Sequence, residues 1–99
     1  MDLTREETTF KTDFKIAIPF GINAIKDTYK NCLEFAESDY KIFTELVMAL
    51  NHLSWELHFQ HKEQLAELFA KLYYDADARY FQLFGEDKEA MRFFIKVTD

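Results

Sequence analysis

Three histidines and a glutamate lie close together near the middle of the chain, and imidazole and carboxylate groups are common ligands of zinc and iron. His52 and Glu56 are four residues apart and would share a helix face, whereas His58 would lie about 120° away from His52. Neither an H-E-x-x-H motif nor a Glu-x-x-His pair occurs, so the spacing supports neither a zinc protease nor a di-iron bundle. A metal-dependent enzyme using His52, Glu56, His58 and His61 is kept as an alternative. The main prediction is polar residues at a helix end and in the following connection, with no metal or cofactor.

Two other groups could carry chemistry. The Cys32 thiol could act as a nucleophile, but it falls on the apolar face of a predicted helix, which predicts a small buried residue. The acidic pair Asp75 and Asp77 and the acidic segment 86–89 lack calcium-loop spacing, so we expect solvated surface there. The chain also has no glycine-rich phosphate loop, no G-x-S-x-G and no C-x-x-C. We therefore predict that the protein is not an enzyme.

The strongest functional signal is a second apolar face on the most apolar predicted helix, residues 39–60. One side of this helix carries a continuous stripe, formed by Phe43, Leu46, Val47, Leu50, Leu53 and Leu57. Four further residues fall between about 120° and 180° from Phe43, at about 100° per residue, namely Met48, His52, Trp55 and Phe59. A helix that is apolar on two faces must bury both. The partner is either the first and last segments of its own chain or another protein.

The second possibility is an interaction surface. It would be anchored by Met48, Trp55 and Phe59, because tryptophan and methionine are favoured in interface cores, with Glu45 and Glu56 at the rim. On the next predicted helix, Tyr74 and Phe81 both lie opposite the main apolar stripe, which adds to this case. Each is an ordinary exposed aromatic when taken alone.

Composition limits the remaining options. The chain has 99 residues, a formal net charge of −6 and 48% hydrophobic residues, which predicts one folded domain, residues 1–99. No basic cluster is present, so direct binding of nucleic acid is not expected. The longest apolar runs are far shorter than the roughly 20 residues that span a bilayer, so no membrane is expected. A single cysteine and an acidic start without a signal-peptide pattern predict a cytoplasmic protein.

Few turn-forming residues interrupt the chain, which is typical of long helices joined by short loops. We expect helices over about 4–15, 22–37, 39–60 and 62–84, followed by a helical start to the tail. Thr4 and Glu7 have capping-box spacing, Ser38 or Asp39 can cap the third helix, and Gly85 is a C-terminal stop.

Two segments are ambiguous. Apolar residues alternate over 14–20 as in a strand, and segment 92–98 contains β-branched and aromatic residues that suit either state. The prediction is an all-α bundle of four to five helices with a long central helix. The alternative is a mostly helical α+β domain in which 14–20 and 92–98 pair as a two-stranded ribbon.

Segments 26–31, 43–51 and 97–99 resemble small proteins encoded by phages and conjugative elements of gut bacteria. The resemblance covers most of the chain from about Lys26 and implies an accessory protein of a mobile element in a bacterial cytoplasm. It implies no catalytic residue. We therefore expect a small acidic helical protein that acts by binding another protein, or itself as a homodimer. Besides the metal-dependent enzyme, a second alternative to this function is an acidic inhibitor that mimics nucleic acid, although acidic residues here alternate with basic ones.

Overall fold

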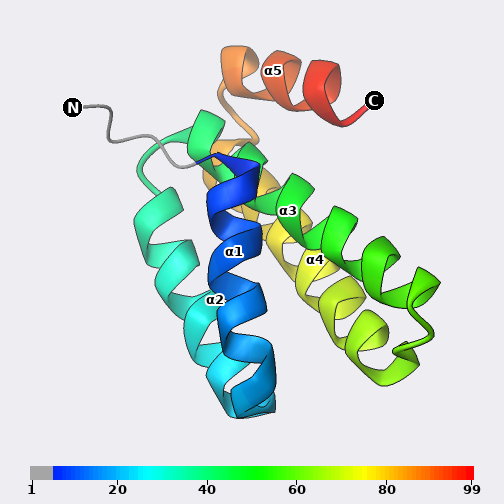
Figure 1. Ribbon diagram of the computed structural model, residues 1–99. Coiled ribbons are helices and arrows are strands. Elements are labelled where there is room, and N and C mark those ends of the chain that lie inside the picture. The colour runs from blue at the N-terminus through cyan, green and yellow to red at the C-terminus, as the bar shows by residue number, and fades with distance from the viewer. Residues whose placement is uncertain (1–5) are drawn as a thin grey trace.

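The computed structural model describes residues 6–99 (Figure 1). The elements in chain order are α1 (Glu7–Ala17), the 3-10 helix η1 (Ile18–Phe20), α2 (Ile22–Ala36), α3 (Tyr40–Phe59), α4 (Glu63–Phe84) and α5 (Lys88–Thr98). No strand occurs in this part of the chain. The predicted all-α helical bundle is therefore confirmed, with helix ends within a few residues of those expected from the sequence.

Local sequence explains where the helices begin and end. The Asp39 carboxylate accepts a hydrogen bond from the Lys41 backbone N–H (2.8 Å) and caps α3, so Asp39 and not Ser38 is the capping side chain. Asp87 caps α5 in the same way, accepting from Glu89 and Ala90. α4 ends at Phe84, and Gly85 is its C-cap, as predicted. The predicted cap at Thr4 lies outside the described residues.

The alternative with a two-stranded ribbon is wrong. Residues 14–17 continue α1 and residues 18–20 form η1, with Pro19 at its start, while 92–98 belong to α5. Phe14 and Ala17 are three residues apart and both buried, so a helix satisfies the core better than the alternating pattern would. Ile16 and Phe20, which a strand would have placed beside Phe14, are exposed.

The helices form two antiparallel pairs with a fifth helix across one end (Figure 1). α3 contacts α1, α2, α4 and α5 and is therefore the central helix. Its turn into α4 is tight and uses His61 with a positive φ of 61°. α1 and α2 cover one side of the α3–α4 pair.

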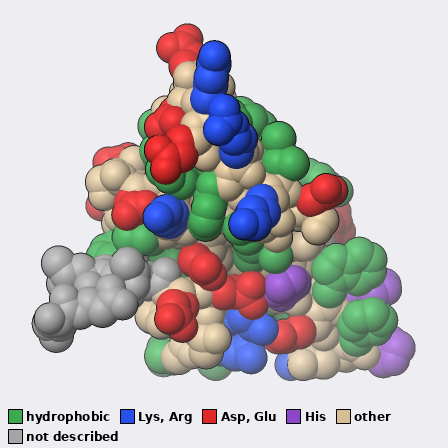
Figure 2. Space-filling view, turned by 90° about the horizontal axis from the view of Figure 1, so that it is seen from above, with side chains coloured by type: hydrophobic (Ala, Val, Ile, Leu, Met, Phe, Trp, Pro, Cys, Tyr) green, Lys and Arg blue, Asp and Glu red, His purple; other side chains and the backbone are tan. Residues whose placement is uncertain are grey.

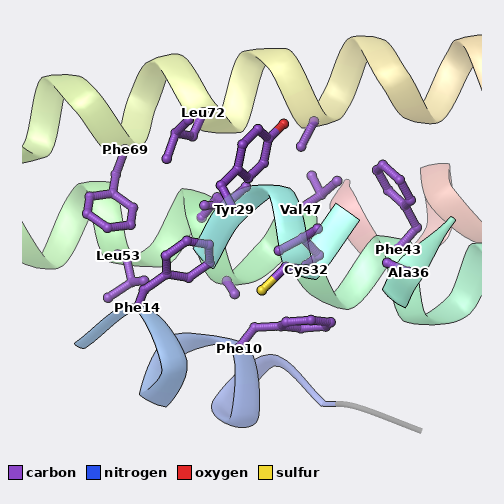
Figure 3. Packing of buried hydrophobic residues seen from close by; sticks show 14 of the residues in the cluster. Phe10, Phe14, Tyr29, Cys32, Ala36, Phe43, Val47, Leu53, Phe69 and Leu72 are labelled. Atoms are coloured by element: carbon purple, nitrogen blue, oxygen red, sulfur yellow. The ribbon is translucent and has the colours of Figure 1, made fainter. Parts of the chain in front are cut away.

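The core lies where these helices meet (Figure 3). All six residues of the predicted α3 stripe are buried. Phe14 of α1 contacts Phe69 of α4 edge to face with ring centroids 5.4 Å apart, which connects the two helix pairs. α5 is held by Tyr80, whose ring stacks on Phe94 at 4.2 Å and whose hydroxyl donates to the Ala90 carbonyl. Within residues 6–99, no helix has both the length and the apolar character needed to cross a bilayer.

Candidate protein-interaction surface

The outer side of α3 presents an aromatic ridge, which we define as Trp55, His58 and Phe59. Trp55 is 54% exposed and Phe59 is 74% exposed. Their rings stack with centroids 6.1 Å apart, and the His58 ring lies edge-on to Trp55 at 5.9 Å. Large hydrophobic side chains are visible beside histidine side chains at the right of Figure 2. Met48, on the same side of α3, is half-buried.

α1 covers one flank of this ridge. The Glu7 backbone N–H donates to Glu45 Oε2 (3.0 Å), and His52 Nδ1 lies 2.8 Å from Glu7 Oε2. Lys11 Nζ lies 2.5 Å from Glu56 Oε1. Three of the residues that the sequence places in the candidate interface, Glu45, His52 and Glu56, are thus bound by α1 of the same chain.

The environment of Glu56 favours its charged form. The hydrogen bond from Lys11 and the charges of Lys11 and Lys15 hold its pKa below the usual value, against the opposite effect of partial burial. Glu56 therefore remains an anion that fastens α1 to α3, and its carboxylate is engaged within the molecule.

The other flank of the ridge opens into a groove between α3 and α4, which we call the α3–α4 groove. It has a volume of about 470 Å³. Apart from Tyr73, its less exposed lining residues are small or short, namely Ser54 and Asn51 from α3 and Ala66 and Ala70 from α4. Small side chains there allow another backbone to approach the two helices closely.

Aromatic and acidic side chains complete the groove. Trp55 and His58 line it from α3, and Tyr73 and Tyr74 line it from α4, with the two tyrosine rings 5.2 Å apart. Tyr74 is 69% exposed. The remaining lining residues are Glu63 and Glu67, and no lysine or arginine lines the groove. The lining is therefore largely apolar and contains two carboxylates.

The charged residues at this groove form only exposed pairs. His58 Nδ1 lies 3.3 Å from Glu63 Oε2, and Lys71 Nζ lies 3.5 Å from Glu67 Oε1. Exposed pairs of this kind contribute little to stability, about 0–1 kcal/mol, so a partner can replace them at low cost.

Phe81 lies apart from this groove. It is 43% exposed and its ring contacts Phe94 of α5 edge to face at 5.4 Å. Phe81 thus helps to seat α5. The structure brings Trp55, Phe59 and Tyr74 to one exposed region and leaves Phe81 at the α5 end of α4.

The four candidate metal ligands are not brought together. His52 lies against Glu7, Glu56 against Lys11, and His58 against Glu63, while His61 lies in the α3–α4 turn. Residues 6–99 contain no group of three or more His, Cys, Asp or Glu side chains placed to hold a metal ion.

The other residues considered for chemistry, Cys32 and Asp75, both make contacts that stabilise the fold. Cys32 is buried among the core residues, as its apolar spacing predicts. Asp75 Oδ2 accepts hydrogen bonds from the Tyr29 hydroxyl (2.6 Å) and from Arg79 Nε (2.8 Å), so it links α2 to α4. Burial raises the pKa of Asp75. The two hydrogen bonds and the Arg79 charge lower it by more, so that the pKa of Asp75 lies below its usual value.

Sequence reasoning missed Tyr73 and the small residues of the groove. Their signal was present, because Ala66, Ala70, Tyr73 and Tyr74 lie at helical spacing along α4. It also missed a second exposed apolar group at the α1–α2 turn, formed by Ile16, Phe20 and Ile22. Ile16 belongs to the last turn of α1, Phe20 to η1 and Ile22 to the first turn of α2.

Comparisons of the chain with models of known protein families, with curated proteins and with solved structures find no match.

Proposed function

We propose that this protein acts by binding another protein through the aromatic ridge and the adjoining α3–α4 groove. The observation that carries the proposal is the exposure of Trp55 and Tyr74, which line one groove, together with the exposed Phe59 that stacks on Trp55 beside it. Exposed apolar area of this kind is unfavourable in water unless a partner covers it. Tryptophan and tyrosine are also the residues that most often dominate the energy of protein interfaces.

The proposal includes the setting of this activity. A single cysteine suits a reducing compartment, so we place the protein in a cytoplasm. The resemblance of segments 26–31 and 43–51 to proteins of phages and conjugative elements supports the role of an accessory protein of a mobile element.

The partner is either a second copy or a different protein, and solution mass separates these cases. Light scattering on the wild type and on Trp55→Glu tests the first case directly. A wild-type dimer that becomes a folded monomer in Trp55→Glu supports the proposal with self-association. A wild-type monomer excludes self-association and leaves a different protein as the partner to be tested.

The proposal fails at this step if the wild type is a dimer and Trp55→Glu leaves the dimer unchanged, because the contact must then lie elsewhere. A matched control is Phe20→Glu, which places the same charge on the separate exposed group at the α1–α2 turn. Far-ultraviolet circular dichroism confirms that each variant keeps its helices.

A further inference from the structure

We infer that the α3–α4 groove binds a positively charged amphipathic helix of a partner protein, an inference that rests on the proposed function and names its partner class. The groove combines a small-residue base, aromatic sides and two carboxylates with no lysine or arginine in its lining. Each of these three features restricts the occupant in a different way.

The length and base of the groove favour a helix. Its α4 lining runs from Glu63 to Tyr74, which spans about 16 Å at the rise of an α-helix, or about three helical turns. Ala66 and Ala70 lie on successive turns of α4, so an apposed helix can approach closely along that line. Addition of a partner strand would need an exposed sheet edge, and residues 6–99 contain no strand to provide one.

The electrostatics favour a basic partner. Glu63 and Glu67 are both exposed at the groove, where they form only weak surface pairs with His58 and Lys71, and the chain as a whole carries a net charge of −6. The faces of Trp55, Tyr73 and Tyr74 also attract lysine and arginine side chains through cation–π interactions. A second copy of this acidic chain would bring like charges together, so complementarity favours a different, basic protein.

The test uses peptides and the fluorescence of Trp55, which is the only tryptophan in the chain and lines the groove. The probe is a tryptophan-free amphipathic helical peptide with lysine and arginine on its polar face. The comparison peptide has the same apolar face and glutamate at each of those polar positions. We expect the basic peptide to shift the Trp55 emission and to bind at least about tenfold more tightly than the acidic one.

Two charge variants show whether the effect is local. Glu63→Lys with Glu67→Lys should weaken binding of the basic peptide about tenfold, because repulsion replaces attraction at the groove. Asp27→Lys with Glu34→Lys changes the net charge equally on exposed positions of α2 and should leave the affinity within about twofold. Equal weakening by both pairs would show a general charge effect and overturn the inference.

Other outcomes identify another occupant or none. Equal affinity for the two peptides, lost in Tyr74→Ala, would overturn the inferred partner charge while supporting the interaction surface. Tetramethylammonium ions that bind as tightly as the basic peptide would reduce the site to one for small cations. Binding of neither peptide would overturn the inferred partner class, and so would a wild-type dimer with Tyr74 in its interface. The proposed function would then be judged separately, by light scattering on the wild type and Trp55→Glu.

Discussion

The Asp75 carboxylate belongs to a residue type that often takes part in catalysis, but here it connects two helices. It accepts hydrogen bonds from the nearly buried Tyr29 hydroxyl and from Arg79, so it fastens α2 to α4. The same contacts raise the pKa of Tyr29, first through burial and then through the Asp75 carboxylate. The hydrogen bond therefore keeps Tyr29 protonated and Asp75 ionised.

This pairing predicts a specific pH dependence. Because the pKa of folded Asp75 is lowered, its contribution to stability is present above the unfolded pKa of about 3.9 and is lost as the pH falls through the folded pKa. Asp75→Asn should make the free energy of unfolding less dependent on pH below about 4, with an effect of about 1 kcal/mol or less because the side chain is partly exposed. Urea unfolding at several pH values measures this, with the exposed Asp27→Asn as control. An unchanged acid dependence in Asp75→Asn would contradict the assignment.

Phe14 and Trp55 are both large aromatic residues, but the structure gives them opposite roles. Phe14 is fully buried against Phe69, so Phe14→Ala should lower the free energy of unfolding by about 3–5 kcal/mol. Trp55→Ser removes an exposed ring and should cost less than about 1 kcal/mol. Urea unfolding of both variants checks this difference. A loss in Trp55→Ser as large as that in Phe14→Ala would make Trp55 a core residue and remove the basis of the interaction surface.

At the scale of elements, the ends of α3 depend on particular side chains. Asp39 caps its first turn, whereas Ser38 makes no such contact in the structure. Asp39→Ala should therefore lower the free energy of unfolding by about 1 kcal/mol, and Ser38→Ala should leave it nearly unchanged. Thermal unfolding of the two variants distinguishes them, and equal losses would contradict the assignment of the cap.

The sequence predicted most helices because their apolar spacing is strong. The α3 stripe has a clear helical period, and every one of its residues is buried. Segment 14–20 misled this reasoning because its apolar residues happen to alternate, although only Phe14 and Ala17 are buried and Ile18 packs against the core from its edge. In α5, local propensity was balanced, and the Asp87 cap with the packing of Phe94 on Tyr80 favours the helix.

The candidate surface was only partly predictable for a related reason. Helical spacing fixes which side of α3 carries Met48, Trp55 and Phe59. It does not fix which flank α1 covers, because that depends on long-range contacts such as Lys11 with Glu56. The groove likewise requires two helices in register, and the spacing of one helix alone contains no such information.

For the whole molecule, charge and apolar surface are arranged differently. Acidic and basic side chains alternate over the face seen in Figure 2 and do not form a continuous acidic stripe. Three of the exposed aromatic side chains, Trp55, Phe59 and Tyr74, lie at one ridge and the adjoining groove, whereas Phe20, Phe35 and Phe81 lie elsewhere. A molecule built in this way favours apolar contact with a protein, with charge selecting among partners.

The most direct test of this account is site-specific photo-crosslinking in cells that naturally make the protein. A photoreactive phenylalanine analogue is placed at Phe59 or Tyr74 in the interaction surface, or at Phe35 in α2 as an exposed control. The account predicts one discrete protein adduct from positions 59 and 74 and none from position 35. Adducts from position 35 alone, or none from positions 59 and 74 in a folded protein, would contradict it.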